Sequence, residues 1–413
     1  MIKSLKENSL SKWWETSSKS NKSSTHISLI DKIRNERRIE AFRKQLFTTL
    51  KQVPEDKKNQ HIWKEKVINQ ITKMESSLSL YDVSLLDFFL NNGYGDVTNS
   101  FINNVKEFDP NMNVYDIFQA IRNVWIMNSI QILFNIEIKL TPSIFAYSML
   151  YPYSDNYLDD PNIDFNDKIE FSSRFNKWLS GEKVKPINDI EEKIFNLILM
   201  IEDEFDRNQY PQIFNSLLAI HRAQEQSLKQ QKEKTLPYEK DVIGISFEKG
   251  GTSVLADAFL VRGNLNLEEA NFMFSYGVFL QLIDDLQDVE EDYKNSHMTI
   301  FSQLENTFKL DNLINKLINF IDNFYINETY FNSENAKVLK KVIRDCSYIM
   351  INEAISKNKT RFSIEFTKEF ESNSLVRYSY FKKLKMKFQN TFTSEDIVKL
   401  LEVLSNNLTI FPT

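Results

Sequence analysis

Glycine and proline are scarce in this chain, and this scarcity constrains its fold more than any other feature of the sequence. Eight glycines and nine prolines occur among 413 residues, about a third of the ~12% share found in average proteins. Sheets joined by tight turns need these residues, because glycine adopts left-handed conformations and proline fixes the bends on which such turns depend. The sequence therefore predicts an all-α protein.

Most prolines lie at or near the ends of stretches with helical character, so they predict helix boundaries. Only Pro152 falls inside such a stretch. The helices expected from this punctuation cover residues 30–50, 60–80, 112–138, 142–160, 189–208, 211–234, 238–262, 267–294, 311–327, 335–357, 361–371 and 394–406. No composition shift marks a linker, so we expect one all-α domain over 29–413, with 29–110 as an added helical layer. Residues 1–28 are rich in Ser and Lys and are expected to be a flexible N-terminal segment.

Charge, cysteine content and hydropathy exclude several classes of protein. The net charge of −6 argues against a nucleic-acid partner. Cys346 is the single cysteine, so neither an intrachain disulfide nor a multi-cysteine metal site can form. No run reaches the ~18 apolar residues of a membrane span, and the opening sequence MIKSLKENSLSKWWE lacks the apolar core of a secretory signal. We therefore expect a cytoplasmic protein without a transmembrane segment.

Two of the expected helices combine strong start signals with acidic ends. The first begins at Thr141-Pro142, an N-cap followed by proline at the first helical position, and ends in YPYSDNYLDDP. The second begins at Asn266, with Glu269 placed as in a capping box, and ends in QLIDDLQDVEEDYK. The polar side chains at these ends are Asp155, Asn156, Asp159 and Asp160 in the first helix, and Asp284, Asp285, Asp288, Glu290, Glu291 and Asp292 in the second.

These carboxylates lie where a helix does not favour them. Residues four apart share a helix face, so Asp155 and Asp159 repel each other, as do Asp284 and Asp288. Near a helix C-terminus they also face the negative end of the dipole. The upstream side chains on the same faces, such as Leu280, are largely apolar. A solvated helix end would explain one such cluster, but two indicate a cation site, and hard oxygen ligands favour Mg²⁺, with Mn²⁺ as the alternative.

Two adjacent glycines interrupt a third helical stretch, FEKGGTSVLADAFL. Each glycine weakens a helix by ~1 kcal/mol relative to alanine, so we expect a break at Gly250-Gly251. Such a break would free backbone N–H groups and aim Lys249 and Thr252 at an anion. The alternative interpretation is a close contact between two helices.

Two further segments carry candidate binding residues. On the helix LLAIHRAQEQSLKQQ, His221 and Gln224 belong to a polar stripe, although a buried core histidine is the alternative. Near the C-terminus, RYSYFKK offers Arg377 and Tyr378 for an anion, or else forms a solvated basic face.

The two acidic motifs, in this order and at this separation, resemble those of the class I isoprenoid (terpene) synthase superfamily. Its DDxxD motif corresponds here to Asp155-Asn156-x-x-Asp159-Asp160, and its second acidic motif to Asp284-Asp285-x-x-Asp288-x-x-x-Asp292. The resemblance covers roughly residues 115–390 and is strongest to the bacterial class IB group, which includes large-terpene synthases. It implies a helical bundle around a central cavity, in which three Mg²⁺ ions bridge both motifs to the diphosphate of a linear prenyl substrate.

The resemblance also assigns roles to individual residues. The metal ligands would be Asp155, Asp159, Asp160, Asp284, Asp285, Asp288 and Asp292. Catalysis would depend on Asp155, Asp159, Asp284, Lys249 and Arg377. Substrate contacts would come from Asn156, His221, Gln224, Lys249, Gly250, Gly251, Thr252, Gln281, Arg377 and Tyr378. A dry aromatic cavity could be lined by Tyr147, Tyr151, Phe272, Tyr276 and Phe279, for which plain core positions are the alternative.

The implied reaction is departure of diphosphate from an allylic carbon, as in a terpene synthase or cyclase, a carbon–oxygen lyase. Elongating prenyltransferases follow their first motif with an Arg-Arg pair, whereas this chain continues PNIDFNDKIEF with no arginine before Arg174. A prenyl-joining synthase on the same fold and a non-catalytic helical binding protein remain the alternatives. Substrate chain length, product skeleton and assembly, including a homodimer, stay open.

Overall fold

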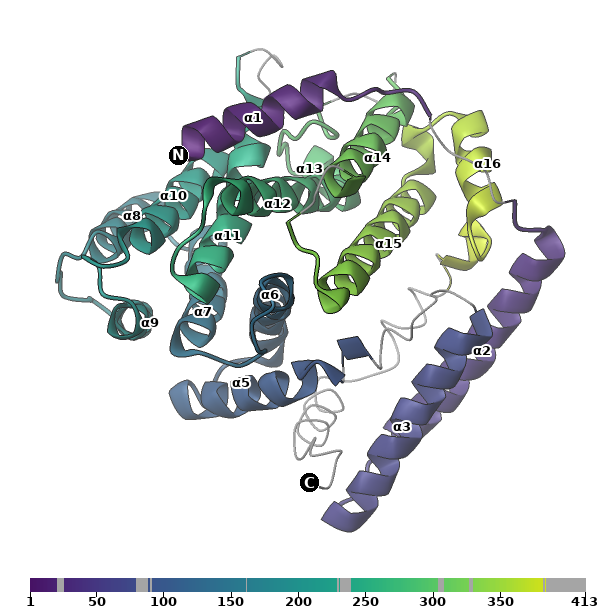
Figure 1. The fold of residues 1–413 in the computed structure, drawn as a ribbon, viewed down its shortest axis with the longest axis horizontal. Coiled ribbons are helices and arrows are strands. Elements are labelled where there is room, and N and C mark those ends of the chain that lie inside the picture. Colours follow the sequence, from purple (N-terminus) through teal and green to yellow (C-terminus); the bar gives the residue numbers. More distant parts are fainter. Residues whose placement is uncertain are drawn as a thin grey trace.

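This computed structural model describes residues 1–20, 26–78, 88–89, 91–160, 162–228, 230, 239–303, 308–326, 330–381 and 383, apart from the side chains of 57, 75–78, 159, 165, 228 and 326. Every regular element in these residues is helical, which confirms the all-α prediction (Figure 1). The helices are α1 (Ile2–Glu15), α2 (Leu29–Leu50), α3 (Lys57–Leu78), α5 (Tyr94–Phe108), α6 (Val114–Leu133), α7 (Pro142–Asp159), α8 (Phe165–Leu179), α9 (Asp189–Glu204), α10 (Pro211–Leu228), α11 (Val242–Arg262), α12 (Leu267–Gln287), α13 (Val289–Lys294), α14 (Asp311–Ile326), α15 (Glu334–Lys357), the short 3₁₀ helix η1 (Lys359–Arg361) and α16 (Ile364–Asn373).

Helices α11 and α12 pack against each other at the centre of the fold, and glycines let their backbones touch. A Cβ atom added to Gly277 would lie 2.0 Å from the carbonyl oxygen of Gly250, and one added to Gly251 would lie 2.4 Å from the ring of Phe274. Helix α11 runs unbroken through this contact. The predicted break at Gly250-Gly251 is therefore wrong, and the alternative interpretation, a close helix contact, is correct.

The other helices surround this pair. Helices α6, α7 and α10 pack on α11, α14 and α15 pack on α12, and α8 and α9 cover α10 and α7 (Figure 1). Most apolar side chains of these helices belong to one continuous buried core.

The first helix does not match the expected flexible N-terminus. Helix α1 lies across α11, α12 and α14. Its Leu5 and Trp13 are only 1% and 2% exposed, and the hydroxyls of Ser9 and Ser275 lie 3.3 Å apart. Residues 2–16 are thus part of the packed fold, because one face of this Lys- and Ser-rich helix carries the large apolar side chains that the core accommodates.

The expected added layer divides into two parts. Helices α2 and α3 form a long antiparallel pair at the edge of the molecule (Figure 1). They have a small core of their own around Trp63 and Val67, and the Trp63 indole donates to the carbonyl oxygen of Thr49 at 2.7 Å. Helix α5 instead packs on α6 and belongs to the main core.

Several helix boundaries differ from those expected. Helices α5 and α8 were not predicted, and the long helix expected over 267–294 is interrupted at Asp288, where α12 ends and α13 follows. The helix expected over 394–406 lies outside the described residues. Within the described part of the chain, no helix is both long and apolar enough to cross a bilayer.

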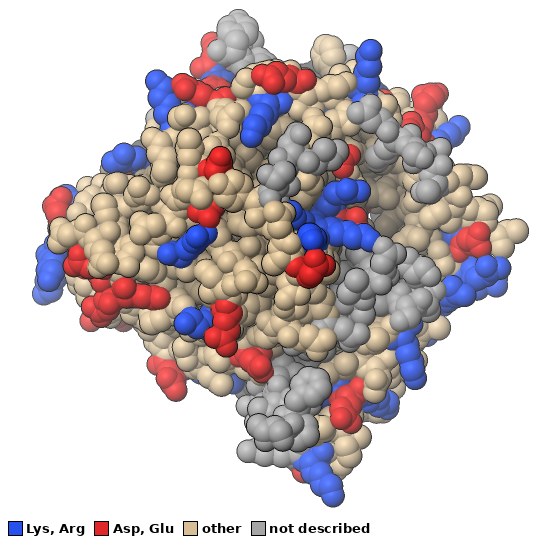
Figure 2. All heavy atoms as spheres, in the orientation of Figure 1, with Lys and Arg blue, Asp and Glu red and all other residues tan. Residues whose placement is uncertain are grey.

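The charged side chains on the face seen in Figure 2 are mixed in sign. Lysine and arginine alternate with aspartate and glutamate over uncharged surface, and no broad single-sign region covers this face (Figure 2). A surface of this kind gives the face no general attraction for a polyanion.

Candidate functional site at the acidic ends of α7 and α12

A cavity of about 110 Å³ lies where α7, α8, α10, α11 and α12 meet. Five polar residues predicted from the sequence line it, namely Asp155, His221, Gln224, Lys249 and Gln281, and so do the predicted Tyr147 and Tyr151. The remaining wall is mostly apolar or aromatic and comprises Tyr147, Leu150, Tyr151, Ser154, Leu158, Phe175, Leu179, Leu217, Ile220 and Ser253. The fold thus brings predicted polar residues from four helices to one concavity.

Tyr151 links the two acidic helix ends. It lines the cavity and is 46% exposed. Burial by the surrounding protein raises the pKa of Tyr151 well above its usual range, and the charges of Asp155 and Asp284 raise it further. Asp155 of α7 and Gln281 of α12 line the same cavity, so these two helix ends lie near each other although they are far apart in the sequence.

At the end of α12, Asp285 is buried and held by its neighbours. It accepts hydrogen bonds of 2.8 Å from the Gln281 amide and from the Ser246 hydroxyl. Burial raises the pKa of Asp285 to about 6, although these bonds and Lys249 oppose the shift. Asp285 is therefore a positioned acid rather than a fully solvated one.

Asp292, after the break between α12 and α13, remains near the other carboxylates. Burial raises its pKa to about 8, and repulsion from Asp285, Asp288 and Asp284 adds to the shift, while Lys249 lowers it. A cation near these four side chains would relieve that repulsion. Among the described residues, however, no three His, Cys, Asp or Glu side chains converge closely enough to hold a metal ion by themselves.

Lys249 is the positively charged residue of the cavity, and it also affects His297. Lys249 lines the cavity, and its charge affects Asp285, Asp292 and His297. Burial, followed by the charge of Lys249, lowers the pKa of His297 to about 4, so this imidazole is neutral at pH 7. His297 was not predicted; its position five residues after Asp292 was the available signal.

His221 fits both interpretations made from the sequence, a cavity residue and a buried core histidine. It lines the cavity, yet it is only 4% exposed and its Nε2 atom lies 3.2 Å from the hydroxyl of Ser172. The ring of Phe175 meets it edge to face at 4.8 Å. Burial lowers the pKa of His221, so a neutral ring forms part of the wall.

Several predicted residues lie away from the cavity or turn from it. Asn156 donates to Asp116 of α6 at 2.9 Å, and Asp160 accepts from the backbone of Asn162 at 2.8 Å. Thr252 is buried and donates to the carbonyl oxygen of Glu248 in its own helix at 2.6 Å. The side chain of Asp159 lies outside the described residues.

Arg377 and Tyr378 are also absent from this site. The Arg377 guanidinium donates to Glu36 of α2 at 2.8 Å, and the buried Tyr378 hydroxyl donates to Asn352 of α15. Both predicted substrate contacts therefore connect the C-terminal segment to α2 and α15, and their assignment to the site is corrected.

A different arginine, Arg122 of α6, lies beside the cavity. Helices α6 and α7 run antiparallel, with hydrogen bonds from Asn123 to Ser148 at 3.2 Å and from Asn156 to Asp116 at 2.9 Å. This register places the exposed Arg122 next to Tyr151, whose pKa it lowers. No sequence motif indicated Arg122, because its position depends on how the two helices align.

The aromatic residues of α7 and α12 divide between cavity and core. Tyr147 and Tyr151 line the cavity. Tyr276 and Phe279 are buried, and Phe279 packs on Phe324 of α14 at 5.2 Å. Phe272 faces α14 as well, 4.6 Å from Phe324. Tyr276 and Phe279 are therefore core residues, as the alternative interpretation had it, and Phe272 does not line this cavity.

One buried acid, Asp257, lies one turn after the cavity residue Ser253 on α11. Asn123 donates to its Oδ1 atom at 3.3 Å, while its Oδ2 atom has no hydrogen-bond partner among the described residues. Its charge also raises the pKa of the cavity residue Tyr147. Burial raises the pKa of Asp257 itself to about 8, so the folded protein holds this proton near neutral pH.

This buried proton makes stability depend on pH. The unfolded chain releases it near pH ~3.9, so the folded state binds more protons between about pH 4 and pH 8, and stability falls as pH rises through that window. Asp257→Asn removes this fall, and we expect it to raise the free energy of unfolding at pH 8 by about 3 kcal/mol. Urea denaturation of both proteins at pH 6 and pH 8 measures the difference.

The exposed Asp203→Asn provides the matched control and should change stability little at either pH. If Asp257→Asn and the original protein lose stability equally between pH 6 and pH 8, Asp257 is ionised in the fold and the expectation is wrong.

Comparisons with known proteins give no match: no family model, no curated protein and no solved structure matches this chain. The function must therefore be inferred from the chemistry of the site.

Proposed function

We propose that the protein is a Mg²⁺-dependent class I terpene synthase that ionises a linear prenyl diphosphate and releases diphosphate with a terpene product. One observation carries the proposal: Asp155 of α7 and the cation of Lys249 of α11 line one cavity, together with Gln281, which lies one turn before Asp285 on α12. Acidic helix ends beside a cavity lined by apolar side chains and a few aromatic rings suit a substrate with an anionic head and an apolar chain. An isoprenoid-synthase-type bundle with a central cavity is the finer fold that this proposal requires.

The carboxylates fit Mg²⁺ in a particular way. Mg²⁺ is commonly bound by one or two carboxylates together with substrate phosphates and water, rather than by a cage of protein ligands alone. Asp155, Asp284, Asp288 and Asp292 supply oxygen ligands of this kind on two sides, without a preformed three-ligand set. When bound, Mg²⁺, with Mn²⁺ as the alternative, would neutralise charge on the departing diphosphate.

Side chains of the protein would bind the diphosphate head group and stabilise the carbocation. Lys249 and Arg122 would donate charge-assisted hydrogen bonds to the diphosphate. The allylic C–O bond would break with its electron pair leaving on the diphosphate, and the faces of Tyr147 and Tyr151 would stabilise the carbocation. The carbocation would then lose a proton, with the departed diphosphate as acceptor, or capture water.

The size of the cavity limits where the hydrocarbon would lie. At about 110 Å³ the cavity is smaller than the ~300 Å³ of a typical small ligand pocket. It suits the diphosphate and the first carbons of the chain. The remaining carbons would lie along the exposed aromatic side chains of Tyr151 and of Phe118, which is one turn before Arg122 on α6.

Incubation with C10 to C25 prenyl diphosphates and Mg²⁺ tests the proposal, with diphosphate measured enzymatically and products identified by mass spectrometry. We expect a hydrocarbon or alcohol and one diphosphate per substrate. Consumption of added isopentenyl diphosphate would instead indicate a prenyl-joining synthase, and no metal-dependent release with any substrate would indicate a non-catalytic binding protein.

The corrected placement of the arginines gives a separate prediction. Arg122→Met should raise KM for the prenyl diphosphate about tenfold, because it removes a charged donor worth ~1.5 kcal/mol. Arg377→Met should leave turnover unchanged, since Arg377 pairs with Glu36 away from the cavity. Steady-state kinetics of both variants measures this, and the reverse order of effects would restore Arg377 to the site.

A further inference from the structure

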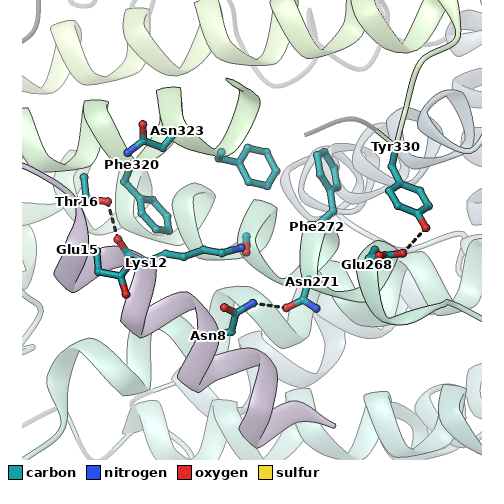
Figure 3. Close-up of a pocket in the computed structure, with 12 residues that line it drawn as sticks. Asn8, Lys12, Glu15, Thr16, Glu268, Asn271, Phe272, Phe320, Asn323 and Tyr330 are labelled. Atoms are coloured by element: carbon teal, nitrogen blue, oxygen red, sulfur yellow. Dashed lines mark hydrogen bonds between the residues drawn. The ribbon is translucent and has the colours of Figure 1, made fainter. Parts of the chain in front are cut away.

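A second and larger cavity, of about 620 Å³, lies at the opposite end of α12 from the acidic cluster (Figure 3). It is enclosed by α1, α12 and α14, together with Tyr330. Its volume is within the ~300–1,000 Å³ range of small-molecule sites. The residues that line it are Asn8, Lys12, Glu15, Thr16, Glu268, Asn271, Phe272, Ser275, Phe320, Asn323, Phe324 and Tyr330.

Helix α1 is fixed over this cavity by specific contacts. The amide of Asn8 donates to Asn271 of α12 at 2.7 Å (Figure 3). Trp13, beside the cavity, packs edge to face on Phe320 at 5.5 Å. Two elements far apart in the sequence therefore build the walls, and the space between them is a feature of the packed fold.

The apolar part of the cavity is aromatic. Phe272 and Phe324 pack together at 4.6 Å, and Phe320 lines the cavity from the same face of α14. A surface of three phenyl rings favours the apolar body of a ligand, since burying such surface contributes about 25 cal/mol per Å².

Lys12 brings a positive charge into this space. Its side chain extends toward the middle of the cavity (Figure 3). Surrounding protein lowers the pKa of Lys12 by burial, although the open cavity leaves the side chain accessible. Among the described residues no carboxylate pairs with it: Glu15 accepts from Ser11 at 2.8 Å, and Glu268 accepts from the Tyr330 hydroxyl.

We propose that this cavity binds a small amphiphilic acid, with its carboxylate on Lys12 and its apolar chain against Phe272, Phe320 and Phe324. An ammonium with no ion pair among the described residues gains a charge-assisted hydrogen bond from an anionic ligand. Asn323 adds an amide to the lining, whereas the amides of Asn8 and Asn271 already donate to Asn271 and to the carbonyl oxygen of Leu267. The proposal is independent of the function proposed for the acidic ends of α7 and α12.

Titration calorimetry with three ten-carbon probes tests the charge preference: decanoate, decanol and decyltrimethylammonium. Decanoate should bind at least tenfold more tightly than decanol, and the ammonium should not bind. Equal binding of all three, or preference for the cation, would overturn the proposal.

Matched variants of α1 test the role of Lys12. Lys12→Met keeps most of the apolar stem and should weaken decanoate binding at least tenfold, whereas Lys12→Arg should retain it. Lys3→Met makes the same charge change on the same helix at a side chain that is 89% exposed, and should have no effect. If Lys3→Met and Lys12→Met weaken decanoate binding equally, the affinity depends on the net charge of the protein rather than on Lys12, and the proposal is overturned.

A blocking variant and a competition experiment locate the binding. Asn323→Trp, at an exposed position of the lining, should abolish decanoate binding by filling the cavity while the helical circular dichroism stays unchanged. Inorganic diphosphate with Mg²⁺ should not compete with decanoate. Competition, or full binding to Asn323→Trp, would place the decanoate elsewhere and overturn the proposal.

Discussion

Replacing Asp155 or Asp284 by asparagine is expected to reduce Mg²⁺-dependent diphosphate release by about a thousandfold or more. Under the proposed function, each change would remove a charged oxygen ligand of Mg²⁺ from one side of the site. Neutralising a departing diphosphate contributes several kcal/mol to the transition state, and each 1.36 kcal/mol corresponds to a factor of ten in rate. Single-turnover release of diphosphate at saturating substrate measures the effect.

Asp160→Asn is the control for these two variants. Asp160 belongs to the same acidic run as Asp155, but its carboxylate accepts hydrogen bonds from Asn162 in its own turn, so activity should fall only slightly. All three variants should keep the original helical circular dichroism. Loss of helix in Asp155→Asn or Asp284→Asn, or equal activity in all three variants, would make the acidic ends structural.

Gly277→Ala should destabilise the fold, by about 2 kcal/mol. The new Cβ would lie 2.0 Å from the carbonyl oxygen and 2.7 Å from the carbonyl carbon of Gly250. Both obstructing atoms are backbone, so the helices α11 and α12 would have to separate. Overpacking of a core costs about 1–3 kcal/mol and occasionally more, which outweighs the ~1 kcal/mol that alanine contributes as a better helix former. The denaturant midpoint at unchanged m-value measures the loss.

Gly251→Ala provides a comparison in which a second substitution can remove the steric clash. Its Cβ would meet the outer ring atoms of Phe274 at 2.4–2.6 Å. Phe274→Leu removes those atoms, so Gly251→Ala should cost less in that background, whereas Gly277→Ala should cost the same with or without it. A double-mutant cycle separates the two cases, and full tolerance of Gly277→Ala would show that the helices do not touch as described.

The local signals in the sequence predicted much of the helical framework. Thr141 caps α7 by accepting from the backbone N–H of Ile144 at 3.3 Å, and Pro142 is the first helical residue. Asn266 and Glu269 form the predicted capping box of α12. These starts were predictable because a cap depends on a few neighbouring residues and hardly on the rest of the fold.

Part of the site was predictable for a related reason. Asp155, Asp284 and Lys249 are polar residues in otherwise apolar helices, so each signals a polar environment at its own position. The sequence did not predict which of these candidates lie together in one site. Arg377 carried the same signal but pairs with Glu36 of α2, whereas Arg122, without any motif, lies beside Tyr151.

By itself, the sequence determined the helical class, the caps of α7 and α12 and the two acidic helix ends, since these depend on composition and on residues within a turn or two. Tertiary structure alone decided that Gly250 and Gly277 would join α11 to α12 rather than break a helix, that Trp13 would bury α1 in the core, and which cations would face the cavity. The physical reason is one of magnitude: a helix propensity or a single charge is worth about 1 kcal/mol, whereas the packing of two helices involves many contacts at once and overrides such preferences wherever they conflict.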